Sequence, residues 1–203
     1  ALRNLNRAAE ADVRLRETLA LDPLDWWARR LNGEQLRCDL PTRLDIAHDC
    51  ARAGLFSEAI ALLQDASAKR RDLPDQSWGA LPLVHYTLGW LEQRRGDKKS
   101  ALKGFKQAAA FPPDYCFPSR LEEIAILDAA LRANPNDARA PYYLGNLLYD
   151  RRRHAEAIQL WERSAKLDAQ FAIVWRNLGI GYFNIRHDAD SARAAYDMAF
   201  RVN

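Results

Sequence analysis

Apolar and small residues recur along the chain at the spacing of amphipathic helix pairs. A small residue is followed twelve positions later by Ala, with a large apolar residue four positions beyond that Ala and another small residue seven beyond it. The twelve-residue spacing occurs at Ala47 and Ala59, Gly89 and Ala101, and Gly145 and Ala157, and with one additional residue at Gly179 and Ala192. In such a pair, the small residue of the first helix permits close approach, and the i, i+4, i+7 set of the second helix forms a buried stripe. Each pair therefore needs neighbouring pairs to cover its stripe.

These patterns predict an all-α chain of about eleven helices. The prolines Pro23, Pro113 and Pro135 agree with the predicted ends, because the residue before a proline is pushed out of the helical region. Ser119 and Asp137 are predicted N-caps. Helices are expected near residues 3–20, 24–37, 41–53, 56–69, 80–95, 98–110, 119–133, 138–151, 154–167, 172–185 and 189–201.

The separation of Gly145 and Gly179, 179 − 145 = 34 residues, is the period of the tetratricopeptide repeat (TPR). The sequence from Ala138 to Phe200 resembles two consecutive TPR motifs, a third motif covers 82–115, and a weaker one covers 40–71. The second copy has the motif residues in order: Trp175, Leu178, Gly179, Tyr182, Ala192, Tyr196 and Ala199. This resemblance implies a right-handed α-α superhelix, the TPR solenoid.

One segment interrupts the repeat. The step from Gly89 to Gly145 is 145 − 89 = 56 residues, one period of 34 plus 22, so we expect an inserted loop at 111–118 and an extra lone helix near 119–133. We expect the whole chain, 1–203, to form a single solenoid. We also expect it to be a piece of a longer protein, because its first partial repeat lacks a first helix. The expected segments are partial repeats over 1–38, repeats over 40–71 and 82–115, the inserted loop and helix over 116–137, and repeats over 138–171 and 172–203.

Composition narrows the range of partners. Lysine and arginine exceed aspartate and glutamate by 30 − 27 = 3, and the charges are interleaved, so no nucleic acid partner is predicted. The basic run from Arg151 to His154 falls on a turn, where such side chains are usually solvated. No stretch approaches the roughly 20 apolar residues of a membrane span. Three cysteines at unrelated spacings, Cys38, Cys50 and Cys116, favour a reducing, cytoplasmic setting.

Motifs that carry chemistry are missing from the sequence. There is no Gly-rich phosphate loop, no Gly-x-Ser-x-Gly elbow and no His-Glu-x-x-His. The run His48-Asp49-Cys50 places neighbours on different faces of a helix, and Cys50 holds a packing position. We therefore predict no enzyme, no cofactor and no metal. An enzyme would need a pocket built from the groove, for example beside the insertion at 111–118.

The TPR resemblance also implies a binding surface, because the first helices of TPR pairs line a concave groove. The groove residues assigned in this way are Tyr86, Trp90, Arg94, Tyr142, Asn146, Tyr149, Arg176, Asn177, Ile180, Phe183 and Asn184. Asn146 and Asn177 match the two Asn positions of the clamp with which some TPR domains hold a C-terminal carboxylate. Tyr142 stands where that clamp has a Lys, which leaves Arg176 to pair with a carboxylate. The alternative interpretation is that several of these aromatic residues only pack between helices.

The predicted function is therefore a protein- or peptide-binding scaffold whose partner is unknown, with weak self-association through the end repeats. The run from Tyr115 to Arg153 is also similar to TPR arrays of large bacterial proteins with an N-terminal domain of unknown function. That narrower resemblance implies a second function, the recognition arm of a larger bacterial enzyme linked to carbohydrate metabolism. A ligand pocket beside 111–118 and a purely structural spacer are the remaining alternatives.

Overall fold

The computed structural model describes residues 2–68 and 79–203, and within them the chain is helical with no β-strand. The α-helices are α1 (Ala8–Leu21), α2 (Trp26–Leu31), α3 (Leu40–Arg52), α4 (Phe56–Ala68), α5 (Leu81–Arg94), α6 (Lys98–Ala109), α7 (Glu122–Ala133), α8 (Arg139–Asp150), α9 (His154–Leu167), α10 (Ala172–Gly181) and α11 (Ala189–Arg201). A 3-10 turn, η1 (Arg3–Leu5), precedes α1, and a π-helical segment, η4 (Tyr182–Arg186), follows α10.

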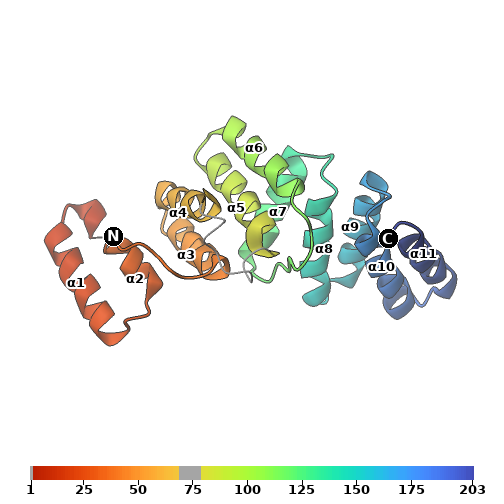
Figure 1. Cartoon of the computed structure of the whole chain (residues 1–203), viewed down its shortest axis with the longest axis horizontal. Coiled ribbons are helices and arrows are strands. Elements are labelled where there is room, and N and C mark those ends of the chain that lie inside the picture. The colour runs from red at the N-terminus through yellow and green to blue at the C-terminus, as the bar shows by residue number, and fades with distance from the viewer. Residues whose placement is uncertain (1, 69–78) are drawn as a thin grey trace.

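Four helix pairs form the repeating unit: α3 with α4, α5 with α6, α8 with α9, and α10 with α11. Two of the second helices, α4 and α9, also pack against the next first helix, α5 and α10 respectively. The pairs are stacked into an elongated molecule with α1 and α2 at one end and α11 at the other (Figure 1). The predicted all-helical, TPR-type repeat fold is thus confirmed. Residues 69–71, predicted to end the repeat over 40–71, lie outside the described residues.

Glycine at the pair interfaces has the predicted role of permitting close approach. A Cβ atom on Gly104 of α6 would lie 2.9 Å from the Cα of Gly89 on α5. A Cβ on Gly145 of α8 would lie 2.5 Å from the indole nitrogen of Trp161 on α9. Real Cβ atoms do not come this close to other atoms, so any larger residue would force the helices apart.

The N-terminal helices are shorter than predicted. The helix expected over 3–20 is interrupted because Asn6 adopts a left-handed conformation, with φ of 56°. The helix expected over 24–37 ends at Leu31, since Gly33 has φ of +85° and the backbone N–H of Glu34 donates to the Arg29 carbonyl. The following segment is extended and held down by Arg43, a buried residue whose guanidinium donates to the carbonyls of two residues in that segment, Leu36 and Cys38.

The additional residue between Gly179 and Ala192 is absorbed by η4. The π-helical turn has one more residue per hydrogen-bonded ring than an α-helix, so it accommodates an insertion without breaking the helix. The helix predicted over 172–185 therefore continues through η4 to Arg186. It ends at His187, whose φ is 55°.

The interrupting helix is α7, which packs against both α5 and α8 and has only sparse contacts with α6. Its first turn also contacts α3, through ion pairs of Arg120 with Asp45 and of Glu122 with Arg52. The predicted N-cap at Ser119 is wrong. The backbone N–H groups of Ser119 and Arg120 instead donate to the buried carboxylate of Glu123, so the helix begins later.

The helix pairs before and after α7 meet at one buried hydrogen bond. The hydroxyl of Tyr86 on α5 donates to a carboxylate oxygen of Asp137 at 2.8 Å. The other oxygen of Asp137 accepts from the N–H groups of Arg139 and Ala140, which begin α8. The Asp137 side chain thus caps the first turn of α8, although the N-cap position is Ala138, one residue later than predicted. Burial raises the pKa of both Asp137 and Tyr86.

Candidate functional site

Four of the predicted site residues are joined in one polar network on α8 and α10. The side-chain oxygen of Asn146 accepts from the indole N–H of Trp161 at 3.0 Å and from the amide of Asn177 at 2.9 Å. The guanidinium of Arg176 donates to the side-chain oxygen of Asn177 at 3.4 Å. Tyr142 joins the network through a hydrogen bond with Asn146. The two Asn residues are therefore held in fixed orientations by neighbours from α8, α9 and α10.

The exposed part of this surface comes from α10 and η4. Arg176 and Asn184 are exposed, Ile180 is half-exposed, and the Phe183 side chain is 60% exposed. Phe183 and Asn184 lie on the π-helical segment η4. With His187 and Ala189 they line a small cavity of about 310 Å³. We define the α8–α10 surface as Asn146, Arg176, Asn177, Ile180, Phe183 and Asn184.

Tyr142 supports this surface from beneath. Its side chain is only 4% exposed, and its ring packs edge-on against Phe171 at a centroid distance of 4.8 Å. Burial raises the pKa of its hydroxyl. Tyr149 is half-buried and packs against the rings of His154 and Trp161. Both tyrosines therefore follow the packing interpretation that the sequence left open.

The α5 part of the predicted groove is not continuous with the α8–α10 surface. Tyr86 is fully buried and hydrogen-bonded to Asp137, so its assignment as a surface contact is wrong. Trp90 is half-buried, and the Arg94 guanidinium lies over the rings of Trp90 and of Phe56 on α4. Arg94 therefore faces the preceding pair, and α7 packs against both α5 and α8.

Other candidates have structural surroundings. His48 is buried at the contact of α3 with the first turn of α7, and burial lowers its pKa. The three cysteines are free and buried, and burial raises the pKa of Cys116 to about 12. The guanidinium of Arg151 donates to the Ser119 carbonyl at 2.6 Å, which ties the basic turn to the insertion. Among residues 2–68 and 79–203, no three His, Cys, Asp or Glu side chains are grouped as metal ligands.

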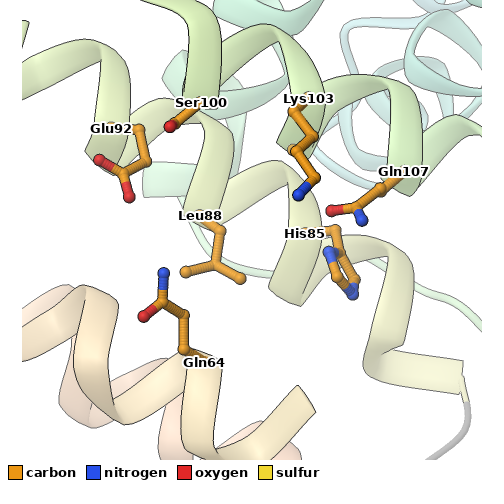
Figure 2. Close-up of a pocket in the computed structure, with 8 residues that line it drawn as sticks. Gln64, His85, Leu88, Glu92, Ser100, Lys103 and Gln107 are labelled. Atoms are coloured by element: carbon orange, nitrogen blue, oxygen red, sulfur yellow. The ribbon is translucent and has the colours of Figure 1, made fainter. Parts of the chain in front are cut away.

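Two further cavities lie away from the α8–α10 surface, one lined by α7, α8 and α9 and the other by α4, α5 and α6. One, of about 530 Å³, has Leu144 and Leu148 of α8 as its floor and charged residues of α7 and α9 at its rim. The other, of about 320 Å³, lies between α4, α5 and α6 and is lined by polar residues on all three (Figure 2). The repeat pattern did not predict this polar cavity. A signal for it was nevertheless in the sequence, because Glu92 is an acid at a position where the other three repeats have Cys50, Leu148 and Tyr182.

In the described part of the chain, no helix combines the length and the apolar character needed to cross a bilayer. No protein-family model matches the chain. Among solved structures, a crystal structure of MamA is 19% identical, with 99% of this chain and 91% of that chain covered and a TM-score of 0.41. A MamA chain from Desulfovibrio magneticus RS-1 is 18% identical over 80% of this chain and 93% of that chain, with a TM-score of 0.38. At this identity and degree of superposition, the likeness indicates neither a site nor a partner.

Proposed function

We propose that the chain is a binding scaffold that holds a segment of a partner protein on the α8–α10 surface and does no covalent chemistry. In this proposal residues 1–203 form a single solenoid that the segment 116–137 interrupts, in a cytoplasmic setting. The bound segment is extended, because paired Asn side chains on successive first helices donate to and accept from a peptide backbone.

The observation that carries the proposal is the fixed network of Asn146, Asn177 and Arg176. A side chain that neighbours already orient loses little conformational entropy when a partner binds. Within the described residues, Arg176 has no carboxylate partner, and its guanidinium is exposed beside the two amides. It is therefore suited to a carboxylate of the bound segment, either a side chain or a free C-terminus.

Apolar contacts would come from η4 and the end of α10. Phe183 is a large exposed ring, and Ile180 is a half-exposed side chain one turn before it. Exposed aromatic residues beside fixed polar groups are typical of the residues that dominate binding energy in protein interfaces. We therefore expect a partner segment with an apolar side chain within a few residues of its carboxylate.

The test is a library of peptides, each synthesised with a free and with an amidated C-terminus, measured for binding to the wild type and to Arg176→Gln. We expect the wild type to select peptides with an apolar residue near a carboxylate. Arg176→Gln should bind these peptides at least about tenfold more weakly, because it loses one charged hydrogen bond to the carboxylate. Phe183→Ala should weaken the same peptides.

Arg193→Gln is the matched control, because Arg193 is an exposed arginine on α11 away from the network. It should bind every selected peptide as the wild type does. Equal binding by the wild type and Arg176→Gln, with both folded by circular dichroism, would exclude the α8–α10 surface as the site. Nothing in the described residues favours the second function, a recognition arm for carbohydrate metabolism.

A further inference from the structure

The polar cavity between α4, α5 and α6 has an acid in its floor where the other repeats have apolar residues. Glu92 lies three residues after Gly89, and the corresponding residues after Ala47, Gly145 and Gly179 are Cys50, Leu148 and Tyr182. The Glu92 side chain lines the cavity and the residue is 7% exposed. A carboxylate at a packing position lowers stability unless it is paired, so an acid there requires an explanation beyond packing.

Pairing within the chain only partly provides that explanation. Among the described residues, the one ion-pair partner of Glu92 is Arg95 at 3.1 Å, one turn along and half-exposed. The Glu92 oxygen in this pair is buried and accepts no hydrogen bond from the described residues, so the pair with Arg95 is a charge contact only. One contact with a half-exposed arginine leaves most of the hydrogen-bonding capacity of a carboxylate unused, and the Glu92 side chain lines the cavity. A further donor would therefore approach from the cavity.

The opposite end of the cavity is basic. Lys103 and Gln107 lie one turn apart on α6, and Gln107 is hydrogen-bonded to His85 of α5. Figure 2 shows Glu92 at one end of the cavity and Lys103, Gln107 and His85 at the other. Lys103 forms no ion pair with any described residue, and burial lowers the pKa of His85, so Lys103 supplies the positive charge at neutral pH.

Between the two ends lie groups that suit a peptide. Ser100 and Gln64 provide polar side chains from α6 and α4, and Leu88 provides an apolar floor. His85 and Glu92 are seven residues apart on α5, which places the two ends about 10 Å apart at the rise of an α-helix. An extended tripeptide has about the same distance between its ammonium and its carboxylate.

We propose that this cavity binds a small zwitterion of about tripeptide length, with its ammonium at Glu92 and its carboxylate at Lys103 and Gln107. A volume of about 320 Å³ is at the lower end of the range for small-molecule sites and suits a ligand of this size. The cavity is lined by residues of α4, α5 and α6 alone, so it is separate from the α8–α10 surface.

The test is isothermal titration with three probes: triglycine, N-acetyl-triglycine, which lacks the ammonium, and triglycine amide, which lacks the carboxylate. For the wild type we expect saturable binding of triglycine and weaker binding of both derivatives. Glu92→Gln should weaken triglycine by about tenfold and leave N-acetyl-triglycine unchanged, because that probe has no charge to lose at Glu92. Lys103→Met should show the mirror result, with triglycine amide unchanged.

Two control variants fix the location. Lys106→Met changes an exposed lysine of α6 that does not line the cavity, and it should bind triglycine as the wild type does. Arg176→Gln should also leave triglycine binding unchanged, and an effect there would place the peptide on the α8–α10 surface and overturn the proposal. The proposal would also be overturned if triglycine gave no saturable heat of binding at concentrations up to about 10 mM. Should Glu92→Gln not fold, Lys103→Met and the three probes still decide the question.

Discussion

Tyr86 joins the helix pairs on either side of α7 through one hydrogen bond. Its hydroxyl and the Asp137 carboxylate are both buried, so water cannot replace either partner. The Tyr143 ring packs against Tyr86 at a centroid distance of 6.0 Å and closes the same contact. This residue therefore contributes to how α5 is placed relative to α8.

Replacing Tyr86 by Phe removes only the hydroxyl and leaves one Asp137 oxygen buried without a donor. We expect a loss of about 1–3 kcal/mol in the free energy of unfolding, measured by urea denaturation. Tyr182→Phe is the control, since its hydroxyl donates to Glu162 at the partly exposed end of the stack and Arg186 still pairs with that acid. It should cost clearly less. Equal losses would show that burial of the Tyr86 bond is unimportant.

His48 predicts how stability depends on pH. Burial is the largest influence on the His48 pKa and lowers it. The acids Glu122, at the start of α7, and Asp45, on α3, raise this pKa, whereas the cations Arg120 and Arg52 lower it. In the unfolded chain the pKa of His48 is about 6.5, so His48 binds a proton more readily there than in the folded chain. Stability should fall as the pH drops through about 6.5 towards the folded pKa.

The measurement is the free energy of unfolding of the wild type and His48→Gln between about pH 5 and 8, the range in which His titrates. His85, whose pKa burial also lowers, contributes in the same direction in both proteins, so the comparison isolates His48. We expect the variant to lose less stability than the wild type on acidification. Parallel curves would rule out His48 as a source of the pH dependence.

The repeat pattern predicts which residues share a surface better than it predicts whether each side chain is exposed to solvent. Asn146, Asn177 and Arg176 were placed on one surface because they lie on the first helices of successive repeats, and the structure joins them. Tyr86 lies three residues before its repeat glycine, as Arg176 does, yet it is buried because Asp137 and α7 come from the insertion, whose path no repeat pattern encodes.

Among the elements, α7 depends on its first turn for its position. Arg120 pairs with Asp45 and with Glu123, and it donates to the Pro41 carbonyl at 3.0 Å. One side chain thus connects the start of α7 to both the beginning and the middle of α3. Because Arg120 is mostly buried, these contacts are less screened by solvent than surface pairs.

Arg120→Ala should loosen α7 from α3 without unfolding the helix pairs. We expect faster amide hydrogen exchange in α7 and a loss of about 1–3 kcal/mol in stability, because the buried Glu123 loses its cation. Arg132→Ala, at the exposed end of the same helix, removes only an i, i+4 pair with Asp128 and should cost less than about 0.5 kcal/mol. A larger effect at Arg132 than at Arg120 would contradict this account of α7.

The element boundaries show what local sequence determines. The ten-helix stretch from α2 onward was predicted in number and order, and α9 and α11 agree with their predicted bounds. The missed features include the interruption at Asn6, the early end of α2 before Gly33, the later start of α7 and the π-helical turn η4. The additional residue between Gly179 and Ala192 was visible in the sequence, but its accommodation depends on how α10 and α11 pack, which spacing alone does not determine.

Over the whole molecule, the two ends differ from the middle because each end helix has one neighbour fewer. On α11 the Phe200 side chain is 89% exposed, and Tyr196, four residues earlier on the same face, is also exposed. In a repeat stack, a face of this kind is covered by the next pair. We predict that two copies of this chain associate through this face.

We therefore expect weak, concentration-dependent dimers that Phe200→Glu abolishes, measured by sedimentation equilibrium. A single helix face buries less than the roughly 1,000 Å² of a stable interface, so association should be weak. A contact of α11 with α11 is symmetric and ends at the dimer, whereas a contact of α11 with α1 repeats from copy to copy and gives longer chains. Leu21→Glu, at an exposed residue on α1, distinguishes the two. For an α11–α11 contact, Leu21→Glu should leave the dimer unchanged. If Leu21→Glu instead abolishes association, the contact joins α11 of one copy to α1 of the next.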